Sequence, residues 1–367
     1  MKNSLGTRLI AGYRRLRVSG SLGNEGYFTD QAKKKTTLIS MIRNESEIME
    51  TFSGHALSLF DRVIFIDHRS TDGTQEYIAL LSEKHPEIEY YCFDEPGYYQ
   101  SDLMTWAAKT LLDKQKPGWV FFLDADEFLP FESKEAFDRK LSEFASFPVI
   151  SMPWLNLVPL DMKSGRVIDQ LFLKPAQASN HRKVAFQPNR MPLDNYFIAQ
   201  GNHAVYIGNR SLKIKMPAER SFSIYHVPIR TKQQLREKIL CGVESYQRMG
   251  TDRRQKNGFH WDQIHRIMVD TDLTTEMMAG IAAQYSDTLQ PPYERSIDEL
   301  RKDGYKELRL EVGFLKPAVS FADVPTSHAD NNIRTGGGSS VDASKDVVAP
   351  HRRIRFDRWS RSMQIIE

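Results

Sequence analysis

The sequence predicts an α/β protein built on a doubly wound, mostly parallel sheet with helices on both faces. Between residues 36 and 123, short and almost continuously apolar segments alternate with segments of helical length. Such alternation is typical of parallel strands that helices cover on both sides. The 367 residues are enough for one large domain or two smaller ones. With 40% hydrophobic and 26% charged residues, the composition is that of a globular protein rather than a disordered one.

The first half of the chain contains four predicted strands separated by helices. Residues 36–42 are β-branched and apolar and follow a run of lysines, which favours a strand. Ser70, Thr71 and Asp72 follow the second strand, and such residues satisfy the free amides of a helix start. We expect Ser101 to cap a later helix in the same way. The expected elements are strands over 36–42, 62–67, 88–93 and 119–123, and helices over 45–59, from the turn 70–74 to 83, and 102–113.

Beyond Pro130 the alternation becomes looser and predicts a mixed region that extends the sheet and forms one wall of a site. Helices are expected over 131–147 and 231–249. Short strands are expected between them, over 149–157, 167–173, 183–186, 203–207 and 222–225.

The chain is therefore expected to form one domain over 36–250, with a first half at 36–130 and a second half at 131–250. A helical extension over 251–322 follows it. A polar, glycine-rich run at 323–350 is typical of a flexible linker. The two ends are a basic arm at 1–35 and a basic tail at 351–367.

Charge is unevenly distributed along the chain. The arm carries eight cations against two anions and the tail carries five against two, which leaves residues 36–350 with a net charge of −6. A folded body of this charge excludes a nucleic-acid-binding surface. The two ends also contain apolar residues, so they are either solvated tails or segments that contact a protein partner or an anionic membrane surface.

Cysteine usage and the N-terminal sequence predict a cytoplasmic protein, peripheral at the inner membrane face if its basic ends bind lipid. Cys92 and Cys241 are too few for a disulfide scaffold or a zinc cluster, so both are expected to be reduced. The N-terminal residues lack the apolar core and the cleavage site of a secretory signal. No stretch approaches the roughly 20 apolar residues that a membrane-spanning helix needs.

Three of the predicted strands end on polar or acidic residues. Ligands of a doubly wound sheet bind at the carboxyl ends of its strands. The sharpest signal is Asp124-Ala125-Asp126-Glu127, directly after an apolar strand. Alternate residues of an extended segment point the same way, so Asp124 and Asp126 are expected to share a cation. Carboxylates are the protein ligands that Mg²⁺ and Mn²⁺ prefer. The competing interpretation is an acidic loop that caps the next helix.

Taken in order, these motifs resemble the nucleotide-sugar-binding half of a family 2-like glycosyltransferase of the GT-A fold. The resemblance covers residues 36–245 and implies a GT-A-type sheet. In the first half it depends on Arg43-Asn44-Glu45, residues 65–74 (FIDHRSTDGT) and residues 122–128 (FLDADEF). The second half is similar to the branch related to family 92 enzymes, at residues 152–154, 165–168, 183–188, 201–203 and 225–230.

The resemblance implies a role for each of these residues. The nucleotide of the donor would lie across the ends of the first two strands, near Arg43, Asn44, Glu45, Asp67, Ser70 and Asp72. Asp124 would face the ribose and the metal, Asp126 would be the direct metal ligand, and His203 would be the third protein ligand. Many family members have two consecutive acids at the second strand end, where this chain has Asp67 and His68.

The chemistry of sugar transfer explains why such groups gather. Breaking a glycosyl–phosphate bond builds negative charge on the leaving diphosphate, which a metal ion and nearby cations stabilise. Lys183, Arg182 and Arg230 are the candidate cations, and the alternative is that they are solvated surface residues. His226 fits either a phosphate contact or a core position, and Tyr98 and Tyr99 fit either stacking on a ring or core packing.

An inverting transfer also needs a general base for the acceptor hydroxyl, whereas a retaining one does not. Glu127 is the preferred candidate, because it alone lies beside the two metal-binding carboxylates in the sequence. Asp161, Asp169 and Asp194 are the other candidates.

The sequence therefore predicts a metal-dependent, inverting glycosyltransferase for polysaccharide or glycoconjugate synthesis. It would move a sugar from a nucleotide-diphosphate donor, a UDP-sugar above all, to a glycan or lipid-linked acceptor with Mn²⁺ or Mg²⁺. Asp124, Asp126 and Glu127 would be its catalytic residues, and Lys183 would bind the donor. Two alternatives remain: a phosphohydrolase with Asp124 as its nucleophile, and a non-catalytic module that binds nucleotides or glycans.

Overall fold

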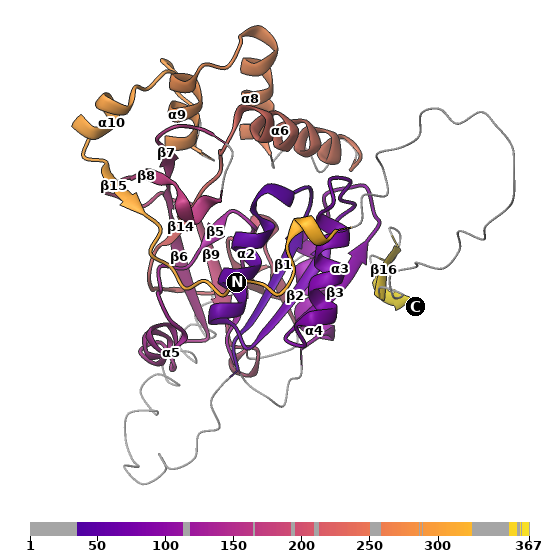
Figure 1. Ribbon diagram of the computed structural model, residues 1–367. Helices are drawn as coiled ribbons and strands as arrows, with labels where there is room; N and C mark the ends of the chain where they lie inside the picture. Colours follow the sequence, from indigo (N-terminus) through magenta and orange to yellow (C-terminus); the bar gives the residue numbers. More distant parts are fainter. Residues whose placement is uncertain are drawn as a thin grey trace, which may run out of the picture.

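The computed structural model describes residues 35–112, 118–163, 166–191, 195–208, 213–249, 258–285, 287, 289–324, 352–357, 360 and 362–366. Among these residues the central feature is a mixed sheet of eleven strands (Figure 1). The strands are β1 (Thr37–Ile42), β2 (Arg62–Asp67), β3 (Ile88–Phe93), β4 (Val120–Phe122), β5 (Glu127–Phe128), β6 (Val149–Asn156), β9 (Arg182–Phe186), β13 (Glu219–Arg220), β14 (Ile224–His226), β16 (Arg352–Asp357) and β17 (Ser362–Ile366). Their order is β17-β16-β3-β2-β1-β4-β9-β6-β14-β5, with β13 paired to β6.

The part of the sheet formed by the first half of the chain is parallel, as the sequence predicts. β1 pairs in parallel with β2 on one side and with β4 on the other, and β2 pairs in parallel with β3. Ile42 lies beside Asp67, so β1 and β2 end at the same edge of the sheet. β9 pairs antiparallel with both β4 and β6, which makes the second half mixed. The α/β class and the mixed extension are confirmed.

Helices cover both faces of the sheet. One face packs against α2 (Ser46–Leu59), α3 (Thr74–Lys84) and α5 (Lys134–Ser142). The other packs against α4 (Gln100–Thr110) and a small antiparallel sheet of β10 (Tyr196–Ile198), β11 (Val205–Ile207) and β12 (Ile214–Lys215). Because side chains alternate along a strand, Leu38 and Ile39 of β1 enter different cores.

A helical layer lies over the carboxyl ends of the strands, at the top of Figure 1. It consists of α6 (Lys232–Gln247), α8 (Phe259–Asp270), α9 (Thr275–Ala283) and α10 (Ile297–Lys302). Leu235, Ile239 and Met277 belong to a separate core in this layer. A three-stranded sheet of β7 (Val158–Pro159), β8 (Leu171–Lys174) and β15 (Lys306–Arg309) joins the same core.

Some boundaries differ from the sequence prediction. α4 begins at Gln100 after Tyr99, so Ser101 lies inside the helix and not at its cap. The Ser101 hydroxyl instead donates to the carbonyl oxygen of Ile198 at 2.6 Å, which fastens α4 to β10. The strand expected over 167–173 is a 3₁₀ turn followed by β8. The 3₁₀ turns are η1 (Val167–Asp169), η2 (Pro188–Arg190), η3 (Gln200–Asn202) and η4 (Phe321–Asp323).

β16 and β17 are part of the main sheet, whereas the sequence predicts a separate basic tail over 351–367. β16 and β17 form an antiparallel hairpin, and β16 pairs in parallel with β3. The side chains of Ile354 and Met363 are buried in the core that contains α4. Arg352, Arg353 and Arg355 of β16 remain exposed, which explains the basic composition of this strand. The arm at 1–34 and the linker residues 325–350 lie outside the described residues.

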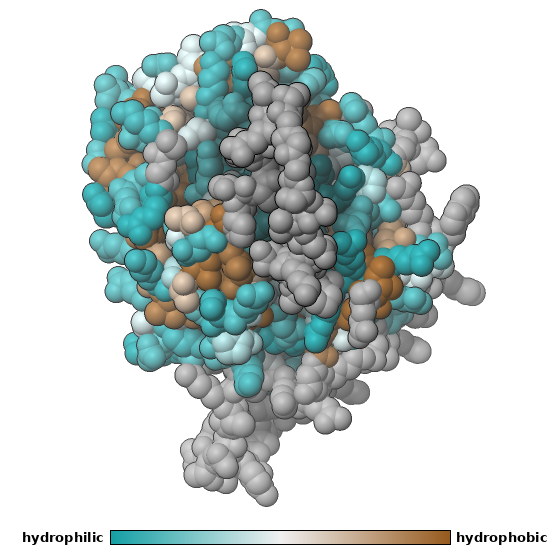
Figure 2. All heavy atoms as spheres, turned by 45° about the vertical axis from the view of Figure 1, so that its right-hand side comes forward, coloured by the Kyte–Doolittle hydropathy of each residue, from teal (hydrophilic) through white to brown (hydrophobic). Residues whose placement is uncertain are grey.

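The described surface in Figure 2 is mainly hydrophilic, with hydrophobic side chains in scattered patches. Within the described part of the chain, no helix combines the length and the apolar character that crossing a membrane requires.

Candidate functional site

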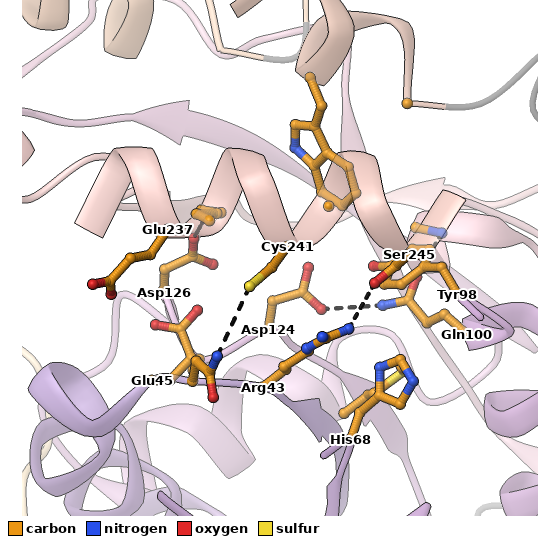
Figure 3. Close-up of a pocket in the computed structure, with 18 of the residues that line it drawn as sticks. Arg43, Glu45, His68, Tyr98, Gln100, Asp124, Asp126, Glu237, Cys241 and Ser245 are labelled. Carbon is orange, nitrogen blue, oxygen red and sulfur yellow. Dashed lines mark hydrogen bonds and ion pairs between the residues drawn. The ribbon is translucent and has the colours of Figure 1, made fainter. Parts of the chain in front are cut away.

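The candidate site is a cleft of about 430 Å³ between the carboxyl ends of the central strands and the helical layer. Figure 3 shows α6 crossing over the residues that follow β1 and β4. The wall on the sheet side includes Arg43, Asn44, Glu45, His68, Asp72, Tyr98, Gln100, Asp124, Asp126, Trp154, Lys183, His203, His226 and Arg230. The wall on the helical side includes Glu237, Lys238, Cys241, Ser245, Tyr246, Trp261 and Tyr285.

The loops after β1 and β2 are joined by hydrogen bonds. Asn44 adopts a left-handed conformation with φ of 53°, and its side-chain oxygen accepts from the backbone amide of Thr71 at 2.8 Å. The amide of Asn44 donates to the hydroxyl of Ser70 at 2.9 Å. The amide of Ser46 donates to the Asp72 carboxylate at 3.0 Å. These bonds bring the two predicted donor-binding motifs together at one end of the cleft.

Asp67 lies below this cleft, where it holds the loop after β2. Its carboxylate is 1% exposed and accepts from the amide of Ser70 at 3.1 Å, and Asp67 is not among the lining residues. Burial raises the pKa of Asp67 to about 6. Arg43, Asn44, Glu45 and Asp72 line the cleft, whereas Asp67 and Ser70 hold the loop behind them.

Asp124 and Asp126 both line the cleft, and each carboxylate has its own lysine. Lys183 of β9 is completely buried and donates to Asp124 at 2.6 Å. Lys238 of α6 forms an ion pair and hydrogen bond with Asp126, whose side chain is 3% exposed. Burial would raise the pKa of Asp126, but the ammonium group of Lys238 and the ring of His226 hold it well below its usual value.

Glu127 lies behind this pair and outside the cleft lining. Its carboxylate is fully buried, 3.4 Å from Lys183, and accepts from the backbone amide of Asp124 at 2.9 Å. Burial raises the pKa of Glu127 well above its usual value, although Lys183 opposes this. The side chain is thus placed to hold Asp124 and Lys183 in position.

His226 is the histidine beside Asp126. Pairing of β14 with β5 puts His226 opposite Glu127, and its Nε2 atom lies 3.7 Å from the Asp126 carboxylate. The amide nitrogen of Asn156 donates to the carbonyl of Tyr285, which leaves the Asn156 oxygen to accept from Nδ1 of His226 at 2.8 Å. Nδ1 of His226 therefore carries a proton. Burial lowers the pKa of His226, and the neighbouring Asp126 carboxylate opposes this. The Nε2 atom faces Asp126.

This donor set fits a divalent cation. Asp126, Glu127 and His226 each offer a ligand atom within 4.8 Å of the others. An imidazole whose second nitrogen is fixed by a hydrogen bond, next to an ionised carboxylate, is a typical metal-binding arrangement. Asp126 and His226 are the members of the group that line the cleft.

His203, the expected third ligand, also lines the cleft but lies outside that group. Its Nδ1 atom contacts the carbonyl oxygen of Arg182 at 2.6 Å, and its ring packs against Trp154. The His203 ring lies directly against the backbone of Gly201, where a Cβ would be 2.3 Å from Nε2 of His203. Glycine is therefore required at this position, and its φ of 72° also favours glycine. Burial lowers the pKa of His203 to about 4.

Arg230 is a second buried cation of the cleft, besides Lys183. It is 3% exposed, and its Nη2 atom donates to Glu45 at 3.0 Å. Its Nε and Nη1 atoms are buried without a hydrogen-bond partner among the described residues. Guanidinium groups left with free donors in a cleft are suited to phosphate oxygens. Arg182, by contrast, is exposed, bonds the carbonyl of Asn180 and does not line the cleft.

Several site residues come from α6 and α8, and sequence reasoning missed them. Cys241 and Ser245 are four residues apart and so lie on the same face of α6, where Ser245 accepts from Arg43 at 2.6 Å. Tyr98 packs against Tyr246 and Trp261 across the cleft, whereas Tyr99 faces the C-terminal hairpin. The amphipathic pattern of α6 predicts the helix, but it contains no signal for the strand ends that the helix covers.

The remaining base candidates lie elsewhere. Asp161 and Asp169 are outside the cleft lining, and Asp169 forms a surface ion pair with Arg166. Asp194 lies outside the described residues.

Part of this chain is similar to a solved structure. No protein-family model matches the sequence, and no curated protein matches it. Among solved structures, the mannosyltransferase PcManGT from Pyrobaculum calidifontis, in complex with GDP-Man and Mn²⁺, is similar to part of this chain. The TM-score is 0.27 and the sequence identity is 18%, over 40% of this chain and 42% of that one. The matched region therefore spans less than half of either protein.

Proposed function

We propose that this protein is a metal-dependent glycosyltransferase that moves a sugar from a nucleotide-diphosphate donor, a UDP-sugar above all. One observation carries the proposal. Asp124 and Asp126 follow β4 at the carboxyl end of the parallel strands and, with the Nε2 atom of His226, lie in a cleft that also contains buried cations. The motif resemblance of residues 36–245 to family 2-like glycosyltransferases of the GT-A fold supports the same function. The acceptor would be a glycan or a lipid-linked sugar of polysaccharide or glycoconjugate synthesis, on the cytoplasmic side.

The residues divide into three roles. Arg43, Asn44 and Asp72 would bind the nucleotide at the ends of β1 and β2, under Ser245 of α6. Arg230, with two buried donor atoms that have no hydrogen-bond partner among the described residues, would bind the diphosphate. Asp126 and His226 would hold Mn²⁺ or Mg²⁺. Asp124 and His203 line the same cleft and would be further ligands.

The reaction needs stabilisation of the leaving diphosphate. A bound divalent ion would neutralise part of the charge that develops on its oxygens. Arg230 would contribute fixed positive charge in a site with little water, where such charge acts most strongly. Trp154, which packs on His226 with ring centroids 4.3 Å apart, would exclude water from the metal-binding side.

Glu127 acts in this proposal as a positioning residue. It fixes the backbone amide of Asp124 and contacts Lys183, while its own carboxylate is off the cleft wall. An inverting transfer would then take its base from another acid of the cleft.

The experiment is titration calorimetry of UDP, GDP, ADP and CDP, each with Mn²⁺ and with EDTA. We expect one nucleotide to bind at least about tenfold more tightly with Mn²⁺, and Asp126→Asn to lose that gain. Asp169→Asn, which removes an exposed carboxylate outside the cleft, is the matched control. Equal binding with and without metal in the wild type would contradict the proposal.

Two further measurements separate the alternatives. Slow, metal-dependent hydrolysis of the preferred nucleotide sugar without an acceptor distinguishes an enzyme from a binding module. A phosphoaspartate trapped at Asp124 would instead identify a phosphohydrolase, because only that mechanism uses Asp124 as a nucleophile.

A further inference from the structure

Lys238 occupies the position that a divalent cation would need. Its ammonium group pairs with the Asp126 carboxylate, on the same oxygen that faces Nε2 of His226. It also lies 3.4 Å from the carbonyl oxygen of Pro228 and 5.2 Å from the centre of the Tyr285 ring. These contacts make Lys238 a cation held inside the proposed metal site.

The Asp126 carboxylate has little room for a second cation. Its side chain is 3% exposed, and both of its neighbours inside the cleft, Lys238 and His226, lie on the Oδ2 side. A divalent ion placed between Asp126 and His226 would meet the ammonium group at close range, where like charges repel strongly. Binding of the ion therefore requires Lys238 to leave.

The cleft offers Lys238 another partner once a donor binds. Lys238 is on α6, one turn before the cleft-lining Cys241 and Gly242, and the flexible side chain of a lysine can change direction without moving its helix. Arg230 and Lys238 line the same cleft, and Glu45 already pairs with Arg230. A diphosphate between these groups would replace the carboxylate as the anion that Lys238 contacts.

We propose that Lys238 is an internal cation that closes the metal site of the free protein and transfers to the donor diphosphate when metal and nucleotide bind together. This inference rests on the proposed function. It makes metal and nucleotide binding mutually dependent, because each ligand removes an obstacle to the other. By linkage, the nucleotide must raise the affinity for the metal by the same factor as the metal raises the affinity for the nucleotide.

The test compares Lys238→Met with the wild type by calorimetry, with Mn²⁺ alone, with the nucleotide alone and with both. Lys232→Met is the matched control, because Lys232 is on the same helix but pairs with the exposed Asp272. For the wild type we expect weak binding of Mn²⁺ alone and a coupling factor of at least about tenfold. For Lys238→Met we expect Mn²⁺ alone to bind about tenfold more tightly and the coupling factor to fall several-fold. Lys232→Met should resemble the wild type.

The coupling factor separates transfer of Lys238 from a simple field effect. If Lys238 acted only as a distant positive charge, the variant would bind Mn²⁺ more tightly but would keep the wild-type coupling factor. That result would overturn the proposal, and so would equal Mn²⁺ affinity in the wild type and Lys238→Met. A far-ultraviolet circular dichroism melt establishes that both variants are folded, and Lys238→Gln provides a second variant if the first is not.

Different titration results would contradict the proposed function and the inference about Lys238. If no nucleotide bound to any form, the proposed function would fall, while the Mn²⁺ titrations would still decide whether Lys238 closes the metal site. If nucleotides bound with metal dependence but Lys238→Met matched the wild type, only the inference about Lys238 would fall.

Discussion

Lys183 shows how one buried side chain organises the candidate site. Its ammonium group is completely buried, with Asp124 at 2.6 Å and Glu127 at 3.4 Å. Burial would lower the pKa of Lys183, but these two carboxylates raise it, so the lysine stays charged. It therefore compensates the acids that lie directly after β4.

We expect Lys183→Met to lower the free energy of unfolding by about 3 kcal/mol, because it leaves the buried Glu127 and the partly exposed Asp124 without their counter-ion. Urea denaturation at pH 7 measures this. Lys140→Met is the control, since its ion pair with Glu143 is exposed and pairs of that kind contribute at most about 1 kcal/mol. Similar losses in both variants would show that Lys183 is not the internal counter-ion described here.

The raised pKa of Asp67 predicts the direction in which the stability of the protein changes with pH. Its pKa is raised to about 6 by burial, compared with about 3.9 in an unfolded chain. Between these values the native protein binds more protons than the unfolded one, so this group's contribution to stability is full below pH 4 and is lost as the pH rises to 6. We expect Asp67→Asn to gain stability relative to the wild type by up to about 3 kcal/mol between pH 4 and pH 7. Urea midpoints at the two pH values test this, and a constant difference would contradict it.

At the scale of elements, the contact between α6 and α8 forms the roof of the cleft. Gly242 of α6 faces Trp261 of α8 so closely that a Cβ at this position would lie 2.3 Å from the indole ring. The absence of a side chain therefore sets the separation of the two helices. It also fixes the indole at the cleft wall, against Tyr98.

We expect Gly242→Ala to destabilise the protein and to weaken nucleotide binding, because the indole must move. The direction of the change in stability is informative, because glycine-to-alanine changes at unobstructed helix positions stabilise a protein by about 1 kcal/mol. Thermal melts and nucleotide titrations measure the two effects. Gln247→Ala, on an exposed turn of the same helix, should leave both unchanged. A more stable Gly242→Ala protein would mean that the helices are free to separate.

Local patterns predicted the elements of the first half well, and long-range contacts explain the misses. The strands from Thr37 to Phe93 are nearly continuous apolar runs, which is why their bounds agree with the structure. The start of α4 was misplaced because Tyr99, which has no side-chain cap hydrogen bond, precedes the helix. Apolar residues that recur about every 3.6 positions identify a helix. They do not indicate which distant strand ends that helix covers.

The same limit applies to the candidate site. The acids after β4 were found because they follow a strand directly, and the structure puts Asp124 and Asp126 in one cleft. The pairing of β14 with β5 that puts His226 beside Asp126 joins residues about 100 positions apart, and no short motif encodes it. The role of Lys238 depends in the same way on a contact between distant elements.

At the scale of the whole molecule, the hairpin of β16 and β17 supports the cleft from outside. Phe356 packs against Tyr99 with ring centroids 4.7 Å apart, and Tyr99 is flanked by the cleft residues Tyr98 and Gln100. β16 also satisfies the free backbone groups of β3. Without the hairpin, β3 would be an exposed edge strand of the kind that promotes association.

We expect truncation after residue 350 to lower the melting temperature, to weaken nucleotide binding several-fold and to promote self-association. Differential scanning calorimetry, titration and light scattering measure these effects. Ile366→Ser is the control, because that side chain is already 40% exposed and contributes little to the core. A truncated protein with unchanged nucleotide affinity would show that the segment from Tyr98 to the start of α4 at Gln100 does not need this support.

The pairing of β3 with β16 also affects the order in which the chain can fold. The two strands are about 260 positions apart, and a ribosome that adds about 5 to 20 residues per second would take roughly 13 to 50 seconds between them. During this interval β3 would have no neighbour on its outer side, although the strands on its inner side would already be available. Nascent copies on one messenger would then be able to cross-pair at that edge, so fast synthesis and widely spaced ribosomes favour the pairing of β3 with β16 of the same chain.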